Sequence, residues 1–187
     1  MSSSPERQTT MLAHEDIRQS FGGIYGGSLY GAKGAKGRVS DTVAAQLLTL
    51  YTLLLAQHRN LWSTHNQVMG STYYGDHLLL ERLYTSMTEE IDDLAERMVA
   101  WIGPGAVDNV PVVQGMARWL TAWAQEAEPF HRAMLGEQAI QEELQRTYDT
   151  IKAGGQMSLG MDDLLMGMAN EHEKAVYLLQ QRLGGRR

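Results

Sequence analysis

The chain has 187 residues with 43% hydrophobic and 20% charged residues, an ordinary composition for a globular protein with one domain. The net charge of −6 argues against a body that is basic all over and binds nucleic acid, and the lack of cysteine excludes disulfides, thiolate metal sites and cysteine nucleophiles. No segment has the roughly twenty apolar residues that span a bilayer, and residues 1–20 lack the apolar core of a signal peptide, so we expect a cytoplasmic protein without a membrane partner.

Residues 1–38 are rich in glycine and show neither helical nor strand periodicity, which predicts a flexible arm. Three basic residues of the arm, Lys33, Lys36 and Arg38, alternate with glycine and would suit the phosphates of DNA. Repetition of the arm over an oligomer would raise the avidity of weak DNA binding and would associate the protein with the nucleoid. The alternative is a solvated tail that packs on the next subunit.

The rest of the chain predicts an all-α fold. Apolar residues recur at helical spacing in four long stretches and one short stretch, separated by glycine and proline. Long helices are expected over about residues 40–66, 72–101, 129–152 and 158–183, and a short helix over about 112–127. Residues 39–184 are therefore expected to form a four-helix bundle, followed by a short basic tail at 185–187.

The second long helix carries two pairs of potential metal ligands. His77 and Glu81 are four residues apart, as are Asp92 and Glu96, so each pair presents two side chains on one face. Glu81 and Asp92 are eleven residues apart, which is about three helical turns, so both pairs lie close to one stripe.

The two pairs are too far apart along the helix to bind one ion. The rise of about 1.5 Å per residue separates His77 from Asp92 by roughly 22 Å. A second copy of the helix, packed antiparallel about a twofold axis near Ser86 and Met87, would bring the first pair of one chain to the second pair of the other. The spacing therefore predicts two identical metal sites at a homodimer interface.

Residues 65–97 resemble the ligand region of the Dps family, the mini-ferritins of the ferritin-like superfamily. That family has a His, a second His twelve residues later, a carboxylate four further on, and an Asp-x-x-x-Glu pair eleven beyond that. The residues at these places are His65, His77, Glu81, Asp92 and Glu96. The sequence departs from the family where Glu81 replaces the usual Asp, and where Asn66 replaces the Trp that commonly follows the first His.

The resemblance implies a ferritin-like bundle with a short helix between the second and third long helices. It also implies a ferroxidase, in which the five residues hold two iron ions between two subunits and Fe(II) is oxidised to Fe(III), preferably by hydrogen peroxide. Ferric mineral would be stored in a hollow dodecamer built from twofold dimers, which would protect DNA from oxidative damage. Zn(II) or Mn(II) could occupy the same ligands. By the same resemblance, Asp162 and Asp163 would line the pore through which iron enters.

Other functions remain open on the sequence alone. The chain could be a DNA-binding or structural shell with an inactive metal site, or a different four-helix metalloenzyme of the manganese catalase type. An intrachain di-iron site would need a Glu-x-x-His pair on the last long helix, and that helix has none. Six other acidic or histidine positions of the last two helices are interpreted as solvated faces: Glu137, Glu142, Glu143, Glu171, His172 and Glu173.

Overall fold

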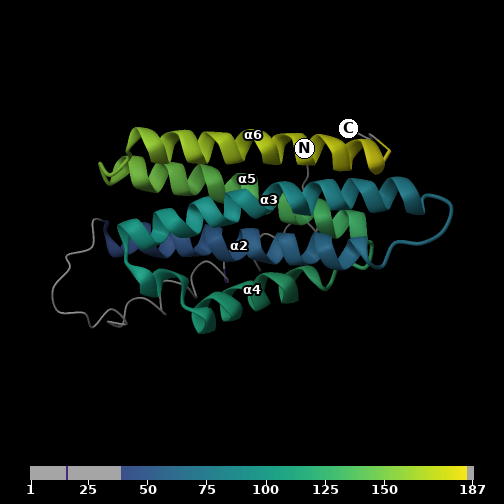
Figure 1. Ribbon diagram of the computed structural model, residues 1–187, viewed down its shortest axis with the longest axis horizontal. Coiled ribbons are helices and arrows are strands. Elements are labelled where there is room, and N and C mark those ends of the chain that lie inside the picture. Colours follow the sequence, from purple (N-terminus) through teal and green to yellow (C-terminus); the bar gives the residue numbers. More distant parts are fainter. Residues whose placement is uncertain (1–15, 17–38, 185–187) are drawn as a thin grey trace.

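The computed structural model describes Asp16 and residues 39–184 of the chain. The elements, labelled as in Figure 1, are α2 (Asp41–His65), α3 (Tyr73–Trp101), the 3-10 helix η1 (Pro104–Val107), α4 (Asn109–Trp123), α5 (Pro129–Ala153) and α6 (Leu159–Arg182). The described residues contain no strand, so the all-α prediction is confirmed. Each long helix begins and ends within one residue of its predicted position, whereas the short helix α4 begins three residues before and ends four residues before its predicted bounds.

Capping groups explain why three of the helices begin where they do. The side chain of Ser40 accepts a hydrogen bond from the backbone N–H of Val43, and Ser158 does the same for α6. Glu128 caps α5, whose first residue Pro129 has no N–H that would need a partner. Because the first N–H groups of a helix have no partner within it, these side chains fix the starting residues.

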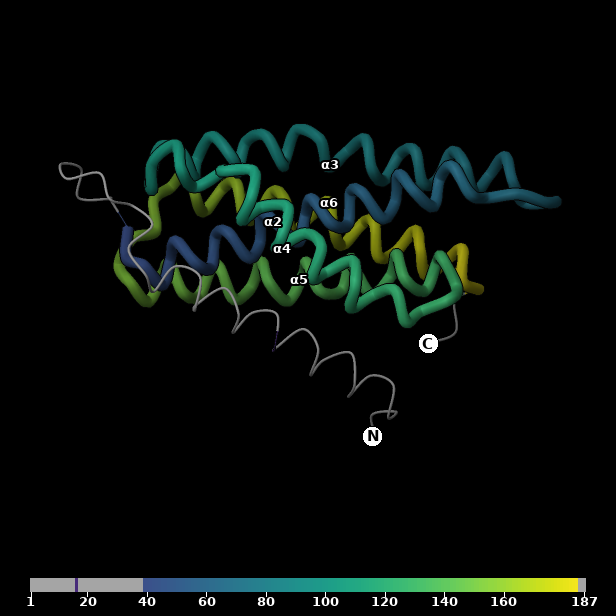
Figure 2. The backbone as a smooth tube through the Cα atoms, turned by 90° about the horizontal axis from the view of Figure 1, so that it is seen from below, coloured from purple at the N-terminus to yellow at the C-terminus, as the bar shows by residue number. Residues whose placement is uncertain are grey.

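The four long helices lie lengthwise beside one another and form the bundle (Figure 1). Helix α2 packs against α3 and α5, and α6 packs against α5 and, over a smaller area, against α3. The short helix α4 lies outside the bundle, mainly against α2, as the view from below shows (Figure 2). The end of α2 and the start of α3 lie at one end of the bundle, while α3 ends and α6 begins at the other (Figure 1). None of the described helices is long and apolar enough to cross a membrane.

Leucine side chains of α2 fill the centre of the core. Leu47, Leu50 and Leu54 recur at helical spacing and have no exposed surface. Beneath α4, the rings of Trp119 and Trp123 lie 6.1 Å apart between centroids, and both are almost completely buried within the chain. Burial of two indole rings makes α4 part of the hydrophobic core and holds it on α2.

An ion pair joins the first turn of α3 to the last turn of α6. The guanidinium of Arg182 donates to both carboxylate oxygens of Asp76, with Nη2 at 2.8 Å from Oδ2, and it lies 4.4 Å above the ring of Phe130. The hydrogen bond from Arg182 lowers the pKa of Asp76 despite the opposing effect of burial. This ion pair ties the first turn of α3 to α6, and His77 directly follows Asp76 in the sequence.

Candidate metal centre

His65 and His77 form one compact pair at the end of the bundle where α2 ends and α3 begins. Their rings are stacked at 3.7 Å between centroids, with 28° between the planes. His65 is the last residue of α2 and is 8% exposed, and His77 lies in the second turn of α3 and is half-buried. The structure therefore brings together two of the five predicted ligands within a single chain.

Two hydrogen bonds to the backbone determine how the imidazoles are oriented. Nδ1 of His65 lies 3.0 Å from the carbonyl oxygen of His77, and Nδ1 of His77 lies 3.3 Å from the carbonyl oxygen of His65. A carbonyl oxygen only accepts, so each Nδ1 carries the proton and donates it. In the neutral imidazole, Nε2 is then unprotonated and free to bind a metal, which is the arrangement that orients ligand histidines in metal proteins.

Aromatic side chains surround this histidine pair. The edge of Tyr84 meets the ring of His65 at 5.2 Å between centroids, and Tyr73 lies 5.1 Å from His77. On its other side, Tyr84 meets His58 at 5.8 Å, where burial and then the charge of Arg59 lower the pKa of the His58 imidazole. His58, two turns before His65 on α2, is thus half-buried and lies against Tyr84, which contacts His65.

The three predicted carboxylate ligands lie on α3 and are exposed. Glu81 is one turn after His77, and Asp92 and Glu96 lie further toward the other end of the bundle. Among the described residues, Asp16 and 39–184, no three His, Asp or Glu side chains are placed to hold a metal ion together. The single chain thus brings together the two imidazoles, and the remaining predicted ligands are not assembled with them.

A shallow depression of about 500 Å³ lies beside Asp92 on the surface formed by α2 and α3. It is lined by Tyr51 and by residues of α3 between Thr85 and Ala95. Burial, and then the negative charge of Asp92, raises the pKa of the Tyr51 hydroxyl. The second carboxylate pair therefore borders a concave and partly apolar surface.

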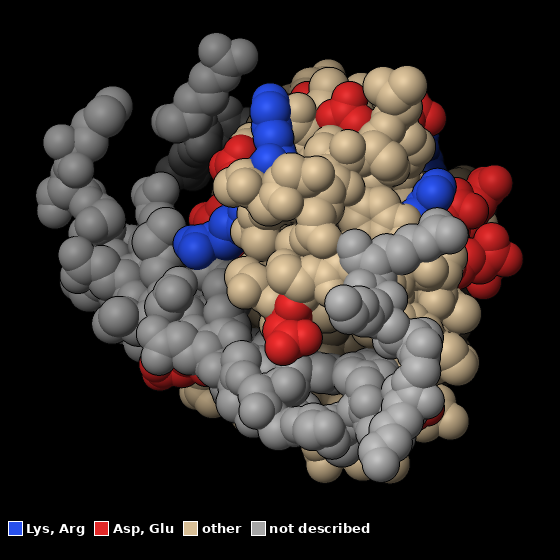
Figure 3. Space-filling view, turned by 90° about the vertical axis from the view of Figure 1, so that its left-hand side faces the viewer, with Lys and Arg blue, Asp and Glu red and all other residues tan. Residues whose placement is uncertain are grey.

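The other predicted sites lie elsewhere. Asp162 is in the first turn of α6, followed by the exposed Asp163, and the nearby Gly160 lies against the side chain of Arg97 near the end of α3. Figure 3 views this end of the molecule, where acidic side chains lie in small groups, several of them beside a basic side chain. A pore lined by Asp162 and Asp163 would form only between subunits, so iron entry past these residues stays a prediction.

The basic residues predicted to bind DNA, Lys33, Lys36 and Arg38, lie outside the described residues.

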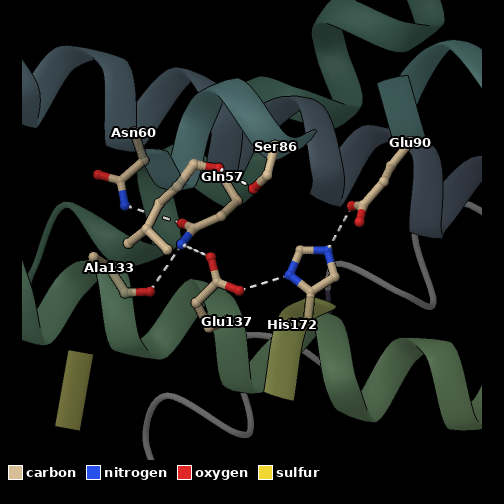
Figure 4. Close-up of polar contacts among 8 residues, drawn as sticks. Gln57, Asn60, Ser86, Glu90, Ala133, Glu137 and His172 are labelled. Atoms are coloured by element: carbon tan, nitrogen blue, oxygen red, sulfur yellow. Dashed lines mark hydrogen bonds and ion pairs between the residues drawn. The ribbon is translucent and has the colours of Figure 1, made fainter. Parts of the chain in front are cut away.

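A second polar cluster lies in the bundle centre, and the sequence interpretation of its residues as solvated is wrong. Glu137 is 1% exposed and His172 is 2% exposed. Nδ1 of His172 lies 2.6 Å from Oε2 of Glu137 on α5, and its Nε2 lies 3.2 Å from Oε2 of Glu90 on α3 (Figure 4). Gln57 of α2 donates to the other oxygen of Glu137 at 2.8 Å. Of the other α5 positions, Glu143 is also buried and Glu142 is exposed.

The periodicity of α6 contains a signal for the buried histidine. His172 is four residues after Met168 and three before Ala175, and both neighbours are buried. That spacing places His172 on the apolar stripe of the helix, whereas Glu171 and Glu173 on either side are exposed. The three adjacent polar residues therefore differ in environment because of helical geometry.

Protonation of His172 is expected to make stability fall with rising pH. Burial by itself lowers the pKa of the imidazole, but the charge and hydrogen bond of Glu137, with those of Glu90, raise it to about 10. Since this pKa exceeds the unfolded value of about 6.5, the protonated side chain stabilises the fold fully below that pH, and the contribution is lost as the pH rises through 10. The difference in free energy of unfolding between the wild type and His172→Gln should therefore shrink from neutral to alkaline pH in urea titrations. A constant difference would contradict the assignment.

Comparison with known proteins yields matches among solved structures. No protein-family model and no curated protein sequence matches the chain. Dps from Thermosynechococcus elongatus is 18% identical with a TM-score of 0.64, and the match covers 77% of this chain and 91% of that one. Mycobacterium smegmatis Dps is 19% identical with a TM-score of 0.62, over 74% of this chain and 78% of that one. This protein therefore has the fold of the Dps structures, a ferritin-like four-helix bundle.

Proposed function

We propose that the protein is an iron-storing mini-ferritin whose ferroxidase centres are completed by two subunits. The observation that carries the proposal is the reciprocal hydrogen bonding of His65 and His77, which commits both Nδ1 atoms to carbonyl oxygens and leaves both Nε2 atoms for a metal. The likeness in fold to the Dps structures supports the same function.

The exposed carboxylates suit a site that is shared between chains. The roughly 22 Å between His77 and Asp92 along α3 prevents them from binding the same ion within one chain. An antiparallel α3 from a second chain would place Asp92 and Glu96 of that chain opposite the histidine pair, with Glu81 as the third ligand beside it. Twofold symmetry makes two such centres per dimer, and we propose that twofold dimers assemble into a dodecamer.

The proposed reaction is the oxidation of iron as a substrate. Two Fe(II) ions and two protons react with one hydrogen peroxide to give two Fe(III) ions and two water molecules, so each iron loses one electron. The imidazoles suit Fe(II), while the carboxylates of Glu81, Asp92 and Glu96 favour Fe(III) and keep the two ions close together. Consumption of both reactants in one step would protect DNA from the hydroxyl radicals that Fe(II) and peroxide otherwise form.

Some parts of the proposal rest on the sequence. They include the preference for peroxide over dioxygen, the occupation of the same ligands by Zn(II) or Mn(II), iron entry past Asp162 and Asp163, and DNA binding by the arm. A DNA-binding shell with an inactive centre is the alternative, and it predicts that Fe(II) binds without being oxidised.

Mixing two inactive variants tests whether the centre is shared. One variant carries His65→Ala with His77→Ala, and the other carries Asp92→Ala with Glu96→Ala. Each alone should oxidise Fe(II) slowly, because both centres of its dimer lack ligands. After the two variants are unfolded and refolded together, a mixed dimer has one centre with all ligands, and peroxide-dependent oxidation of Fe(II) should return to a substantial fraction of the wild-type rate.

The mixture of variants has a clear opposite outcome. If each chain supplied all the ligands of its own centre, every chain in the mixture would still lack an essential ligand and refolding together would restore nothing. Wild-type chains carried through the same refolding procedure measure the activity that the procedure itself loses. Absence of recovery while that control is active would refute the shared centre.

A further inference from the structure

Polar side chains from all four long helices meet in the bundle centre. Gln57 comes from α2, Glu90 from α3, Glu137 from α5 and His172 from α6, and they converge in Figure 4. Ferritin-like di-iron proteins place inward-facing Glu and His residues of four helices around metal in the same part of a bundle. In this chain Glu and His residues also face the bundle centre, but the histidine lies between two carboxylates.

The imidazole of His172 lies between two carboxylates. Its Nδ1 is 2.6 Å from Oε2 of Glu137, and its Nε2 is 3.2 Å from Oε2 of Glu90. Nδ1 donates a hydrogen bond to the ionised Glu137, and Nε2 faces Oε2 of Glu90 within ion-pair distance although the contact is not a well-directed hydrogen bond, so the two carboxylates favour a ring with protons on both nitrogens. A protonated imidazole has no lone pair to offer a metal ion, and its positive charge compensates the charge of the buried Glu137 and that of Glu90, whose side chain is 14% exposed.

The other groups around this centre also donate to the carboxylates or have partners of their own. Nε2 of Gln57 donates to Oε1 of Glu137 and to the carbonyl of Ala133. Its Oε1 accepts from Asn60, whose own oxygen accepts from Nε of Arg132 at 2.9 Å. The chain of contacts thus contains two carboxylates, one imidazolium and one guanidinium, a neutral sum in which donors occupy the positions that a cation would take.

We propose that His172 acts as an internal cation that takes the place of a metal ion between Glu90 and Glu137, and that it thereby excludes metal from the bundle centre. His172 would thereby restrict metal binding to the exposed ligands of α3, which lie outside the bundle centre. This inference is independent of the ferroxidase proposal, because it concerns a different set of ligands. It predicts that removal of the imidazole converts the centre into a metal site.

Binding of Co(II) to the full-length protein provides the test. In a background with His77→Ala and Asp92→Ala, which disables the proposed shared centre, the protein should bind no Co(II) tightly. Addition of His172→Ala leaves the carboxylates of Glu90 and Glu137 facing the space that the imidazole filled, and each chain should gain one bound Co(II) with visible d–d absorption. Further addition of Glu90→Gln and Glu137→Gln should abolish the gain. The exposed His131 provides the matched control, because His131→Ala in the same background should gain nothing.

The opposite results would overturn the inference. One is that a folded His172→Ala chain binds no Co(II). The other is that the background protein, with His172 intact, already binds Co(II) and loses it when Glu90→Gln is added. A second measurement applies if His172→Ala does not fold. In the wild type, ¹⁵N solid-state NMR should find both ring nitrogens of His172 protonated at neutral pH and unchanged when Co(II) is added. A neutral ring, or a ring whose signals Co(II) broadens, would refute the proposal.

Discussion

Replacement of His65 by alanine is expected to slow peroxide-dependent oxidation of Fe(II) by at least about 100-fold, since loss of outer-shell partners alone already costs 10- to 100-fold in metal sites. The substitution removes one metal ligand and also the hydrogen bond that Nδ1 of His65 donates to the backbone carbonyl of His77, which joins the end of α2 to the start of α3. The rate is measured by stopped-flow absorbance of Fe(III) after anaerobic loading with Fe(II).

Two further variants show whether the loss is specific to the pair. His131→Ala removes a histidine from the exposed first turn of α5 and should leave the rate unchanged. His58→Ala removes a ring that contacts Tyr84 and does not touch the pair, so a smaller loss is expected. A rate for His65→Ala within a factor of two of the wild type would show that the stacked histidines are not part of the centre.

The second large effect is expected at Gly136, where alanine should destabilise the fold by about 2–4 kcal/mol. A methyl group there would lie 2.0 Å from Oε1 of Gln57, a side chain that is fully buried and hydrogen-bonded to Glu137. Gln57 has no solvent to move into, so the clash breaks buried hydrogen bonds. This cost exceeds the roughly 1 kcal/mol by which alanine is favoured over glycine within a helix. Urea titration measures the difference in free energy of unfolding.

Gly167 on α6 is the matched control, because it is also helical and a methyl group there meets nothing within 4 Å. Gly167→Ala should therefore stabilise the fold, by up to about 1 kcal/mol. Combination of Gly136→Ala with Gln57→Ala removes the clash, so the two effects should not add. An increase in stability for Gly136→Ala alone would show that Gln57 is not held as the structure places it.

The sequence predicts the helices well because their signals are local. Apolar periodicity, together with caps such as Ser40 and the first-turn residue Pro129, determines each boundary within a few residues. The metal half-site is also predictable in part, since the i, i+4 spacing of His77 and Glu81 is a property of one helix. The approach of His65 to His77 depends on the turn between two helices, and it was expected here from the family pattern.

The bundle centre could not be predicted in the same way because its partners come from different helices. Glu90 and Glu137 each look like one more charged residue on an amphipathic helix, and only the packing of α3, α5 and α6 places them on either side of His172. The charge of a residue in the sequence does not reveal whether it faces water. The position of His172 on the apolar stripe of α6 indicates that it is buried, but the sequence does not indicate that Glu90 and Glu137 compensate its charge.

The two bonds between His65 and His77 have a consequence for the order of assembly. Both bonds join residues only twelve apart in the sequence, so they form when the hairpin of α2 and α3 closes. Contacts between residues close in sequence need little loop closure and form early in folding. We therefore expect a newly folded monomer to have its imidazoles already oriented before it meets a partner. Dimerisation then has to supply only carboxylates to a prearranged half-site, so little ordering of ligands would oppose the last step of building the centre.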